Sequence, residues 1–149
     1  FRPLWLSKCN HFNNPEGSKY FINMIHSMWY SIMMSNLQKE LYSKQNDVNY
    51  DFVIRARFDV TYRHKLFYEK LNPNIMYVAS QVHPDHIHDF FAVSNDTNMN
   101  IYCSLFYNLN YYLSQVTPDW RCGEGILFKI MEKFKIDCQG IDFIDIIRP

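Results

Sequence analysis

Tyr50–Asp59 reads YDFVIRARFD, in which an apolar, β-branched centre is followed by alternating charged residues. The apolar centre predicts a buried strand. Arg55, Arg57 and Asp59 occupy alternate positions near its carboxyl end, so we expect them to project from one face of the strand. Because open α/β sheets bind ligands just beyond the carboxyl ends of their strands, this stretch predicts a central strand that ends at a ligand site.

The patterns around this strand predict an α/β domain with a mixed, mainly parallel sheet flanked by helices. Further strands are expected at Ile75–Ala79, at Phe90–Val93 and, once or twice, within Ile136–Ile147. A helix of about six turns is expected before Lys44. Its buried stripe recurs at three- and four-residue steps and comprises Ile22, Ile25, Trp29, Ile32, Met33, Leu37 and Leu41.

Shorter signals predict the remaining elements. Phe1–Leu6 is interpreted as a short strand or entry segment and Asn10–Gly17 as a loop. Further helices are expected at His64–Leu71, from an N-cap at Ser94 or Asn95 as far as a stop at Pro118, and from Gly123-Glu124-Gly125 onward.

Composition limits the class of protein. The chain has 149 residues, 48% of them hydrophobic, with 15 basic and 15 acidic side chains, so residues 1–149 are expected to form a single domain with a sizeable core. The charge balance argues against a nucleic-acid partner. No segment predicts a signal peptide or a membrane span. The compartment is left open, with the cytoplasm favoured. The start at Phe1 predicts a fragment of a longer chain. The four cysteines lack zinc-site spacing and are expected to be reduced and mostly buried.

The strongest chemical pattern is the strand end. Arg55 and Arg57 offer bidentate contacts to phosphate oxygens, and Asp59 beside them offers a ligand to a divalent cation that bridges a diphosphate. A structural ion pair between Arg57 and Asp59 is the alternative. Asp89 directly precedes the strand Phe90–Val93 and is expected to lie at the entrance to that strand, at its amino-terminal end.

A histidine-rich loop raises a second hypothesis. His83, His86, His88, Asp85 and Asp89 are residue types that bind metal ions, but their spacing matches no closed zinc pattern. A solvated surface loop is therefore the favoured interpretation.

Glu124 and Trp120 complete the candidate residues. Glu124 lies between two glycines in the first turn of an amphipathic helix, where the helix dipole favours a carboxylate whether or not it has a chemical role. The flanking glycines allow a ligand to approach closely. Trp120 lies in the preceding loop, where a flat ring can stack on a sugar face.

These motifs together resemble a known family. Tyr50–Asp59 is similar to the YDxVIRxRxD strand of glycosyltransferase-like proteins with the GT-A fold, the nucleotide-diphospho-sugar transferase type. Ser27–Ile32, Asp89–Ser94 and Trp120–Leu127 come in the order that this group shows, and the resemblance covers most of the chain from Tyr20 to Ile147.

The resemblance implies a role for each candidate residue. Asp59 would bind the divalent cation, Mn²⁺ or Mg²⁺, and the donor diphosphate together with Arg55 and Arg57. Asp89 and Glu124 would be carboxylates on the acceptor side, with Glu124 the base in an inverting reaction.

The sequence also departs from the family pattern. Arg57 replaces the first acid of the usual Asp-x-Asp motif, so the arginines are an alternative to the metal for neutralising phosphate. The first βαβ unit of the fold, which holds the nucleotide base, is expected to be missing or cut short before Phe1.

The sequence therefore predicts a GT-A-like glycosyltransferase that moves a sugar from a nucleotide-sugar donor to the hydroxyl of a glycan or other acceptor, with Trp120 and Asp89 on the acceptor side. Two alternatives stay open. One is a non-catalytic GT-A-like module that binds carbohydrate or nucleotide, and the other is a phosphate-binding hydrolase-like domain.

Overall fold

The computed structural model describes residues 15–62, 65–79, 82, 86–113, 122–141 and 144–145. In these ranges the elements are α1 (Pro15–Asn46), β1 (Val53–Ala56), β2 (Thr61–Tyr62), the 3-10 turn η2 (Tyr68–Lys70), β3 (Met76–Ala79), β4 (Phe91–Ser94), α2 (Asp96–Cys103), the 3-10 segment η3 (Ser104–Asn108), α3 (Leu109–Leu113), α4 (Cys122–Phe134), β5 (Cys138–Ile141) and β6 (Ile144–Asp145). The predicted α/β class is confirmed. The predictions for Phe1–Leu6 and Pro118 lie outside the described residues.

Four strands form one open sheet in the order β1-β4-β3-β5. Strand β4 runs antiparallel to both β1 and β3, whereas β5 runs parallel to β3. Strands β2 and β6 pair separately and antiparallel. The sheet is therefore mixed, as predicted, but the prediction of a mainly parallel sheet is wrong for the described strands. Residues 80–90, which join β3 to β4, are fewer than the dozen or so that a parallel crossover needs, so these two strands pair antiparallel.

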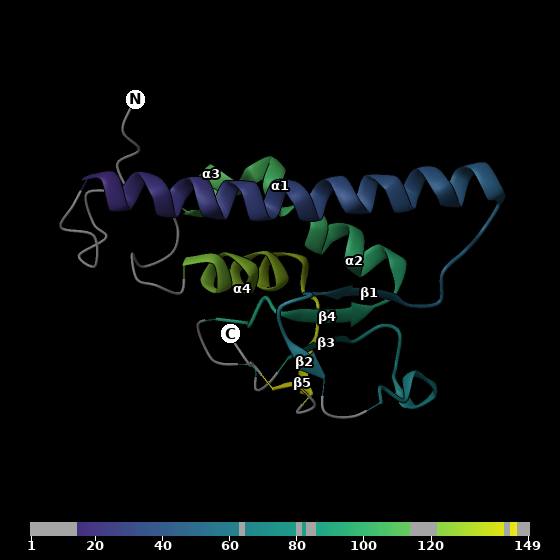
Figure 1. The fold of residues 1–149 in the computed structure, drawn as a ribbon. Coiled ribbons are helices and arrows are strands. Elements are labelled where there is room, and N and C mark those ends of the chain that lie inside the picture. Colours follow the sequence, from purple (N-terminus) through teal and green to yellow (C-terminus); the bar gives the residue numbers. More distant parts are fainter. Residues whose placement is uncertain are drawn as a thin grey trace.

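The position of β1 also differs from the prediction, because β1 is an edge strand of the sheet and not a central one. Figure 1 shows β1 as the strand nearest α1 and β5 as the most distant. Only Val53–Ala56 of the predicted ten-residue strand is extended and paired, and Asp59 lies in the turn that follows.

Two hydrophobic clusters hold the sheet, one on each face, as the period-two alternation of a strand requires. Met76 and Val78 of β3 and Ala92 of β4 join the larger cluster with the buried faces of the helices. Tyr77 and Val93 join the smaller cluster on the opposite face. The sheet is therefore covered on both sides, by helices on one and by the segments around Val60 and Leu71 on the other.

Helix α1 spans the width of the molecule (Figure 1), and its predicted apolar stripe is buried only from Ile25 to Met33. Ile25, Trp29 and Met33 are buried, with Trp29 completely inaccessible. Leu37 and Leu41, which were predicted to continue this stripe, are 38% and 51% exposed, so the prediction is wrong there.

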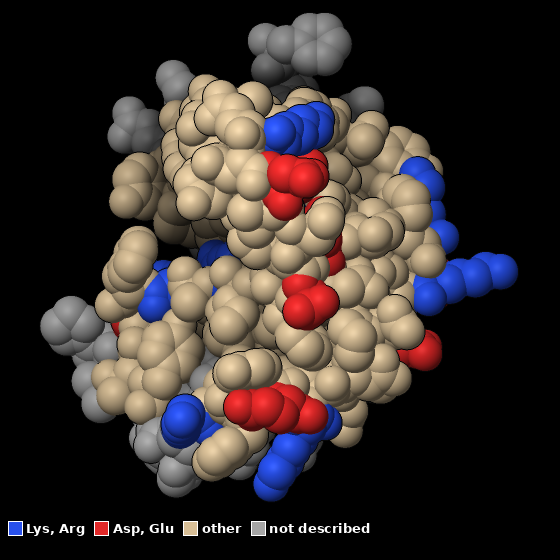
Figure 2. Space-filling model, turned by 90° about the vertical axis from the view of Figure 1, so that its right-hand side faces the viewer, with Lys and Arg blue, Asp and Glu red and all other residues tan. Residues whose placement is uncertain are grey.

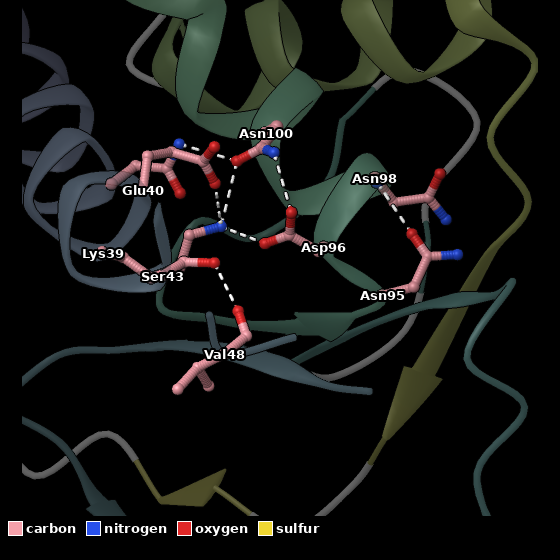
Figure 3. A network of polar contacts seen from close by, with 9 residues as sticks. Lys39, Glu40, Ser43, Val48, Asn95, Asp96, Asn98 and Asn100 are labelled. Carbon is pink, nitrogen blue, oxygen red and sulfur yellow. Dashed lines mark hydrogen bonds and ion pairs between the residues drawn. The ribbon is translucent and has the colours of Figure 1, made fainter. Parts of the chain in front are cut away.

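A polar network attaches the second half of α1 to α2 (Figure 3). It explains why the apolar residues of the stripe are no longer buried in that half of the helix. Lys39 forms ion pairs with Asp96 of α2 and with Glu40. The side chain of Asn36 donates to Asn100 over 2.8 Å. We call this group of side chains the α1–α2 clasp.

Asn95 caps α2, as predicted, because its side chain accepts a hydrogen bond from the backbone N–H of Asn98 over 2.9 Å. The single helix predicted after this cap is interrupted in the structure. Helix α2 ends at Cys103 and is followed by η3 and α3, and the Ser104 hydroxyl donates to the Ile101 carbonyl at the start of η3, which tightens the turn.

Two further predictions are wrong at their boundaries. The predicted helix His64–Leu71 is reduced, within the described residues, to the 3-10 turn Tyr68–Lys70. Helix α1 already begins at Pro15, inside the loop predicted to run as far as Gly17. Proline is tolerated in a first helical turn because its missing N–H has no partner there in any case.

Cys103 and Cys138 are free cysteines, buried and half-buried respectively, as predicted for these two. In the face shown in Figure 2, acidic and basic side chains lie interspersed among uncharged ones, without an extended area of one sign. Among the helices described, none has the length and apolar character needed to cross a membrane.

Candidate functional site

A cavity of about 1100 Å³ lies between α1 and β1 and extends to the first turn of α4. We call it the α1–β1 cavity. Much of its wall is apolar and comes from α1 and α2, including Ile25, Met28, Ile32, Met99 and Cys103. The charged residues that line it are Lys39, Arg55, Arg57, Asp59, Asp89 and Glu124. All five of the candidate site residues in the described part of the chain therefore share one cavity.

Antiparallel pairing brings the two aspartates to the same place. Ala56, the last residue of β1, lies opposite Phe91, the first residue of β4. The residues that follow β1 therefore lie beside those that precede β4, and these include Asp59 and Asp89 respectively. The site forms where one strand ends and its antiparallel neighbour begins, whereas the sequence analysis placed it at the carboxyl ends of parallel strands.

Arg55 and Arg57 reach the cavity because of the alternation in β1. Val53 and Arg55 are half-buried while Ile54 and Ala56 are exposed, so Arg55 is on the side of the strand that faces the helices. Arg57 follows Arg55 by two residues, so the same alternation places it on the same side, just past the end of the strand. Its guanidinium carbon is 5.2 Å from the centre of the Phe90 ring.

Arg57 and Asp59 form the ion pair that the sequence analysis gave as the structural alternative. The Nε of Arg57 donates to Oδ1 of Asp59 over 2.7 Å, and Nη2 of Arg57 contacts the other carboxylate oxygen. The bond to Asp59 raises the pKa of Arg57 above its ordinary value. The two side chains are 29% and 50% exposed, so the pair contributes little to folding and mainly orients the guanidinium.

Glu124 is buried in the first turn of α4, with 8% of its surface exposed. Its Oε1 lies 2.7 Å from Nδ1 of His88. Its backbone carbonyl accepts a hydrogen bond from the N–H of Ile87 over 3.2 Å, which fixes the start of α4 against residues 86–90. Its other oxygen, Oε2, is buried and has no hydrogen-bond partner among the described residues.

His88 is the residue that sequence reasoning missed. It was weighed only as a metal ligand, whereas the structure places it as the partner of Glu124. The hydrogen bond to Glu124 raises the pKa of His88 above its ordinary value. The ring of His88 also stacks on Phe90 at 5.6 Å and 20°, and Phe90 in turn lies under Arg57. A continuous set of contacts therefore connects Arg57 to Glu124.

Asp89 is 7% exposed and lies between these groups. Burial raises the pKa of Asp89, and the positive charge of Arg55 partly opposes that effect. The negative charge of Glu124 adds to the rise. Asp89 therefore lies within the electrostatic reach of Arg55, Arg57 and Glu124 at once.

The residues around Asp59 do not fit a divalent cation. Both carboxylate oxygens of Asp59 contact Arg57, whose guanidinium occupies the side on which a cation would bind. Within the described ranges no three His, Cys, Asp or Glu side chains are grouped so that they could hold a metal ion. Of the other proposed ligands and contacts, His83, Asp85 and Trp120 lie outside the described residues.

Comparison of the chain with protein-family models, with curated proteins and with solved structures gives no match. The chemistry of the α1–β1 cavity and the motifs in the sequence therefore carry the evidence for function.

Proposed function

We propose that this chain is a GT-A-like glycosyltransferase domain that transfers a sugar from a nucleotide-sugar donor to the hydroxyl of an acceptor. One observation carries the proposal: arginines for a diphosphate and buried carboxylates for a hydroxyl line the same cavity, although Arg55 and Glu124 lie far apart in the sequence. Each of these groups has a separate structural explanation, but those explanations do not predict a shared cavity.

The arginines would bind the leaving diphosphate. Arg57 presents a guanidinium oriented by Asp59, and Arg55 adds a second positive charge from the same side of β1. Guanidinium groups bind phosphate oxygens through paired hydrogen bonds and stabilise the charge that develops as the diphosphate departs. Because the donor set at Asp59 does not fit a cation, we derive no step through a metal.

Glu124 would be the base. The acceptor hydroxyl oxygen forms a bond to the anomeric carbon, the bond from that carbon to the diphosphate oxygen breaks, and the hydroxyl proton passes to Oε2 of Glu124. That oxygen has no partner among the described residues, while Oε1 is bonded to His88. His88 is a positioning residue, because it holds the carboxylate without reaching the substrate.

The direct test is a screen of nucleotide-sugars for binding and for release of nucleoside diphosphate, on the full-length protein, with Mn²⁺ or with a chelator. We expect at least one nucleotide-sugar to bind and to turn over, and we expect turnover to persist with the chelator. Turnover that requires Mn²⁺ would contradict the assignment of the diphosphate to the arginines, and the absence of binding by every donor would contradict the proposal.

A non-catalytic module that binds carbohydrate or nucleotide is the second candidate. The observation that favours it is the ion pair between Arg57 and Asp59. The resemblance assigns Asp59 to binding of the donor, but in this ion pair the charge of Asp59 is already neutralised by Arg57. Binding of a nucleotide-sugar without release of its diphosphate, in the presence of a range of acceptors, would identify this candidate.

A further inference from the structure

The α1–β1 cavity runs along the outer edge of β1. Among the described strands, β1 pairs only with β4, so its other edge is an outer edge of the sheet. Every residue from 53 to 59 lines the cavity. Because successive side chains of a strand point to opposite faces, a cavity against one face is lined by alternate residues, whereas a cavity against the edge is lined by all of them. The backbone of β1 therefore forms part of the cavity wall.

This edge carries backbone groups that can bind an added strand. In an antiparallel pair, alternate residues direct their N–H and C=O toward the partner strand, and the residues between them direct theirs away from it. Within Val53–Ala56, these outward groups have no hydrogen bond to another backbone group among the described residues. Outward N–H and C=O groups at the edge of a sheet are a template for pairing with another chain.

The start of β1 lies beside the second half of α1. Val53 pairs with Ser94, shortly before α2 begins at Asp96. Asp96 in turn forms an ion pair with Lys39 of α1. At this end the cavity therefore lies between Val53 and Lys39, both of which line it.

The end of β1 lies beside Glu124. Ala56 pairs with the first residue of β4, and the segment before β4 contacts Glu124 through His88. A Cβ atom at Gly123 would lie 3.9 Å from Cε of Met28, which places an earlier part of α1 at this end. The α1 wall of the cavity therefore runs antiparallel to β1, and both walls reach Glu124.

The two walls match in length, and their shape suits an extended chain. Helix α1 rises about 16 Å between Met28 and Lys39. The chain from Val53 to Arg57 extends over about 13 Å, the length of a peptide of four or five extended residues. Because α1 stands opposite the edge of β1 (Figure 1), the cavity admits one strand and not the sheet of a second copy.

The two faces of β1 define the side chains of such a peptide. Ile54 is 52% exposed and Phe58, which follows it by two alternations, is fully exposed. Apolar side chains at alternate positions of an added strand would pack on these residues. Arg55 projects to the other face, toward the helices, so the side chains at the intervening positions of the peptide would point toward Glu124 and the arginines. Pairing with β1 uses backbone groups and leaves both guanidinium groups available to the diphosphate.

We propose that the outer edge of β1 is the docking surface for an extended peptide, which adds to the sheet as a strand between β1 and α1 and presents a serine or threonine hydroxyl to Glu124. The docking surface follows from the geometry of β1 and α1, whereas the role of that hydroxyl as the acceptor rests on the proposed function. In the transfer step the hydroxyl oxygen bonds to the anomeric carbon, the bond from that carbon to the diphosphate breaks, and the hydroxyl proton passes to Glu124.

The test uses the full-length protein and a synthetic peptide as the probe. The peptide has nine residues, with alternating valine and threonine in its centre and lysine at both ends, and fluorescence polarisation measures its affinity. Two modified peptides carry backbone N-methyl groups, one on the valines and the other on the threonines. Only one of these two sets of amides faces β1 in an added strand. One modified peptide should therefore bind about 10-fold or more weakly, the equivalent of the lost backbone hydrogen bonds, while the other binds like the unmodified probe.

A variant of the α1 wall tests the place of binding. Ser35 is exposed and lines the cavity between Met28 and Lys39. Ser35→Trp should weaken probe binding about 10-fold or more, because the indole ring occupies the space of the added strand. Ser27→Trp is the matched control, since Ser27 is exposed on the same helix and is not part of the described cavity wall, and it should not change the affinity. The N-methylated peptides test the proposal on the wild type, whatever the stability of the variant.

Hydrogen exchange gives a third measurement. The outward amides of β1 should exchange readily in the free protein and become protected when the probe binds. No binding at up to about 1 mM peptide, equal affinities of all three peptides, or full protection of the β1 amides in the free full-length protein would overturn the docking surface. The last result would show that a second copy or another segment of the chain already pairs with β1.

Sugar transfer to the probe separates this inference from the proposed function. With a suitable nucleotide-sugar, a threonine of the probe should gain the mass of one sugar residue. If the probe binds at the edge but no acceptor receives a sugar, the docking surface stands and the transferase proposal fails. If small acceptors receive a sugar but the probe does not bind, the docking surface fails and the transferase proposal stands. Transfer to small acceptors but not to a bound probe would overturn the assignment of the acceptor to a peptide hydroxyl.

Discussion

Nδ1 of His88 lies 2.7 Å from Oε1 of Glu124, across a separation of 36 residues in the sequence. This contact joins the segment before β4 to the first turn of α4. It fixes one oxygen of the carboxylate. The other oxygen is buried without a hydrogen-bond partner among the described residues, and Glu124 lines the α1–β1 cavity. The geometry is that of a carboxylate held in position by a neighbouring donor.

The stability of the protein should depend on the protonation of His88. The bond to Glu124 raises the pKa of His88 in the folded state, so its contribution is complete below the unfolded value of about 6.5 and is lost as the pH rises through the raised folded value. Urea unfolding between about pH 5.5 and pH 8.5 would measure this. His88→Gln keeps a donor but does not titrate, so the difference in stability between wild type and variant should shrink or reverse as the pH rises. A difference that is constant with pH would contradict the prediction.

Glu124→Gln should abolish sugar transfer while leaving donor binding largely intact. The amide keeps the shape of the side chain but does not accept the acceptor proton. Single-turnover release of nucleoside diphosphate, together with calorimetry of the donor, would separate the two effects. Full activity in this variant would exclude Glu124 as the base and favour the non-catalytic module.

Arg57→Ala should weaken binding of a nucleoside diphosphate about 10- to 100-fold, because charge-assisted hydrogen bonds to phosphate are lost. Lys129→Ala, which removes a cation paired with Glu132 on the surface of α4, is the matched control and should have no effect. Asp59→Asn should also weaken binding, because Arg57 loses the partner that orients it. Tighter binding in Asp59→Asn would show instead that the ion pair competes with the donor.

Trp29→Ala should lower the free energy of unfolding by about 3–5 kcal/mol, since it removes a fully buried aromatic ring between α1 and α2. Tyr42→Ala alters an aromatic residue of α1 that is 56% exposed, and it should change stability by less than about 0.5 kcal/mol. Chemical denaturation would compare the two, and a midpoint for Trp29→Ala close to that of the wild type would show that α1 does not pack as described.

Asn95→Ala should destabilise the protein by about 0.5–2 kcal/mol through loss of the cap on α2. Asn110→Ala, on the exposed surface of α3, serves as the control for removal of an asparagine side chain from a helix. If both variants unfold at the same denaturant concentration, the cap does not contribute to stability.

Local patterns predicted the local features of this fold. The spacing of apolar residues identified Trp29 as buried in a long helix, and the polar residues before Asp96 limited the cap to Ser94 or Asn95, of which Asn95 is the cap in the structure. Both features depend on residues within about one or two turns of each other, which the sequence displays directly.

Features that depend on long-range pairing could not be derived in the same way. The edge position of β1 follows from which strands pair with β4, and no residue within Tyr50–Asp59 specifies that. Leu37 is exposed where α1 contacts α2 through the polar side chains of Asn36 and Lys39, a contact between helices that the spacing of apolar residues does not display. The bond between His88 and Glu124 requires both the β4 register and the docking of α4, so His88 appeared in the sequence only as one histidine among several.

Half-buried and exposed residues alternate along β1, and this alternation limits where insertions and deletions can occur without moving Arg55 out of the cavity. A one-residue insertion or deletion between Val53 and Arg55 exchanges the two faces of the strand, so that Arg55 turns outward unless the whole pairing with β4 slides. The connection between η2 and β3 carries no residue of the cavity wall, so changes of length there leave the cavity as it is. Insertions and deletions that preserve function should therefore accumulate between η2 and β3 and be excluded from β1 and from the cavity-lining residues directly after it.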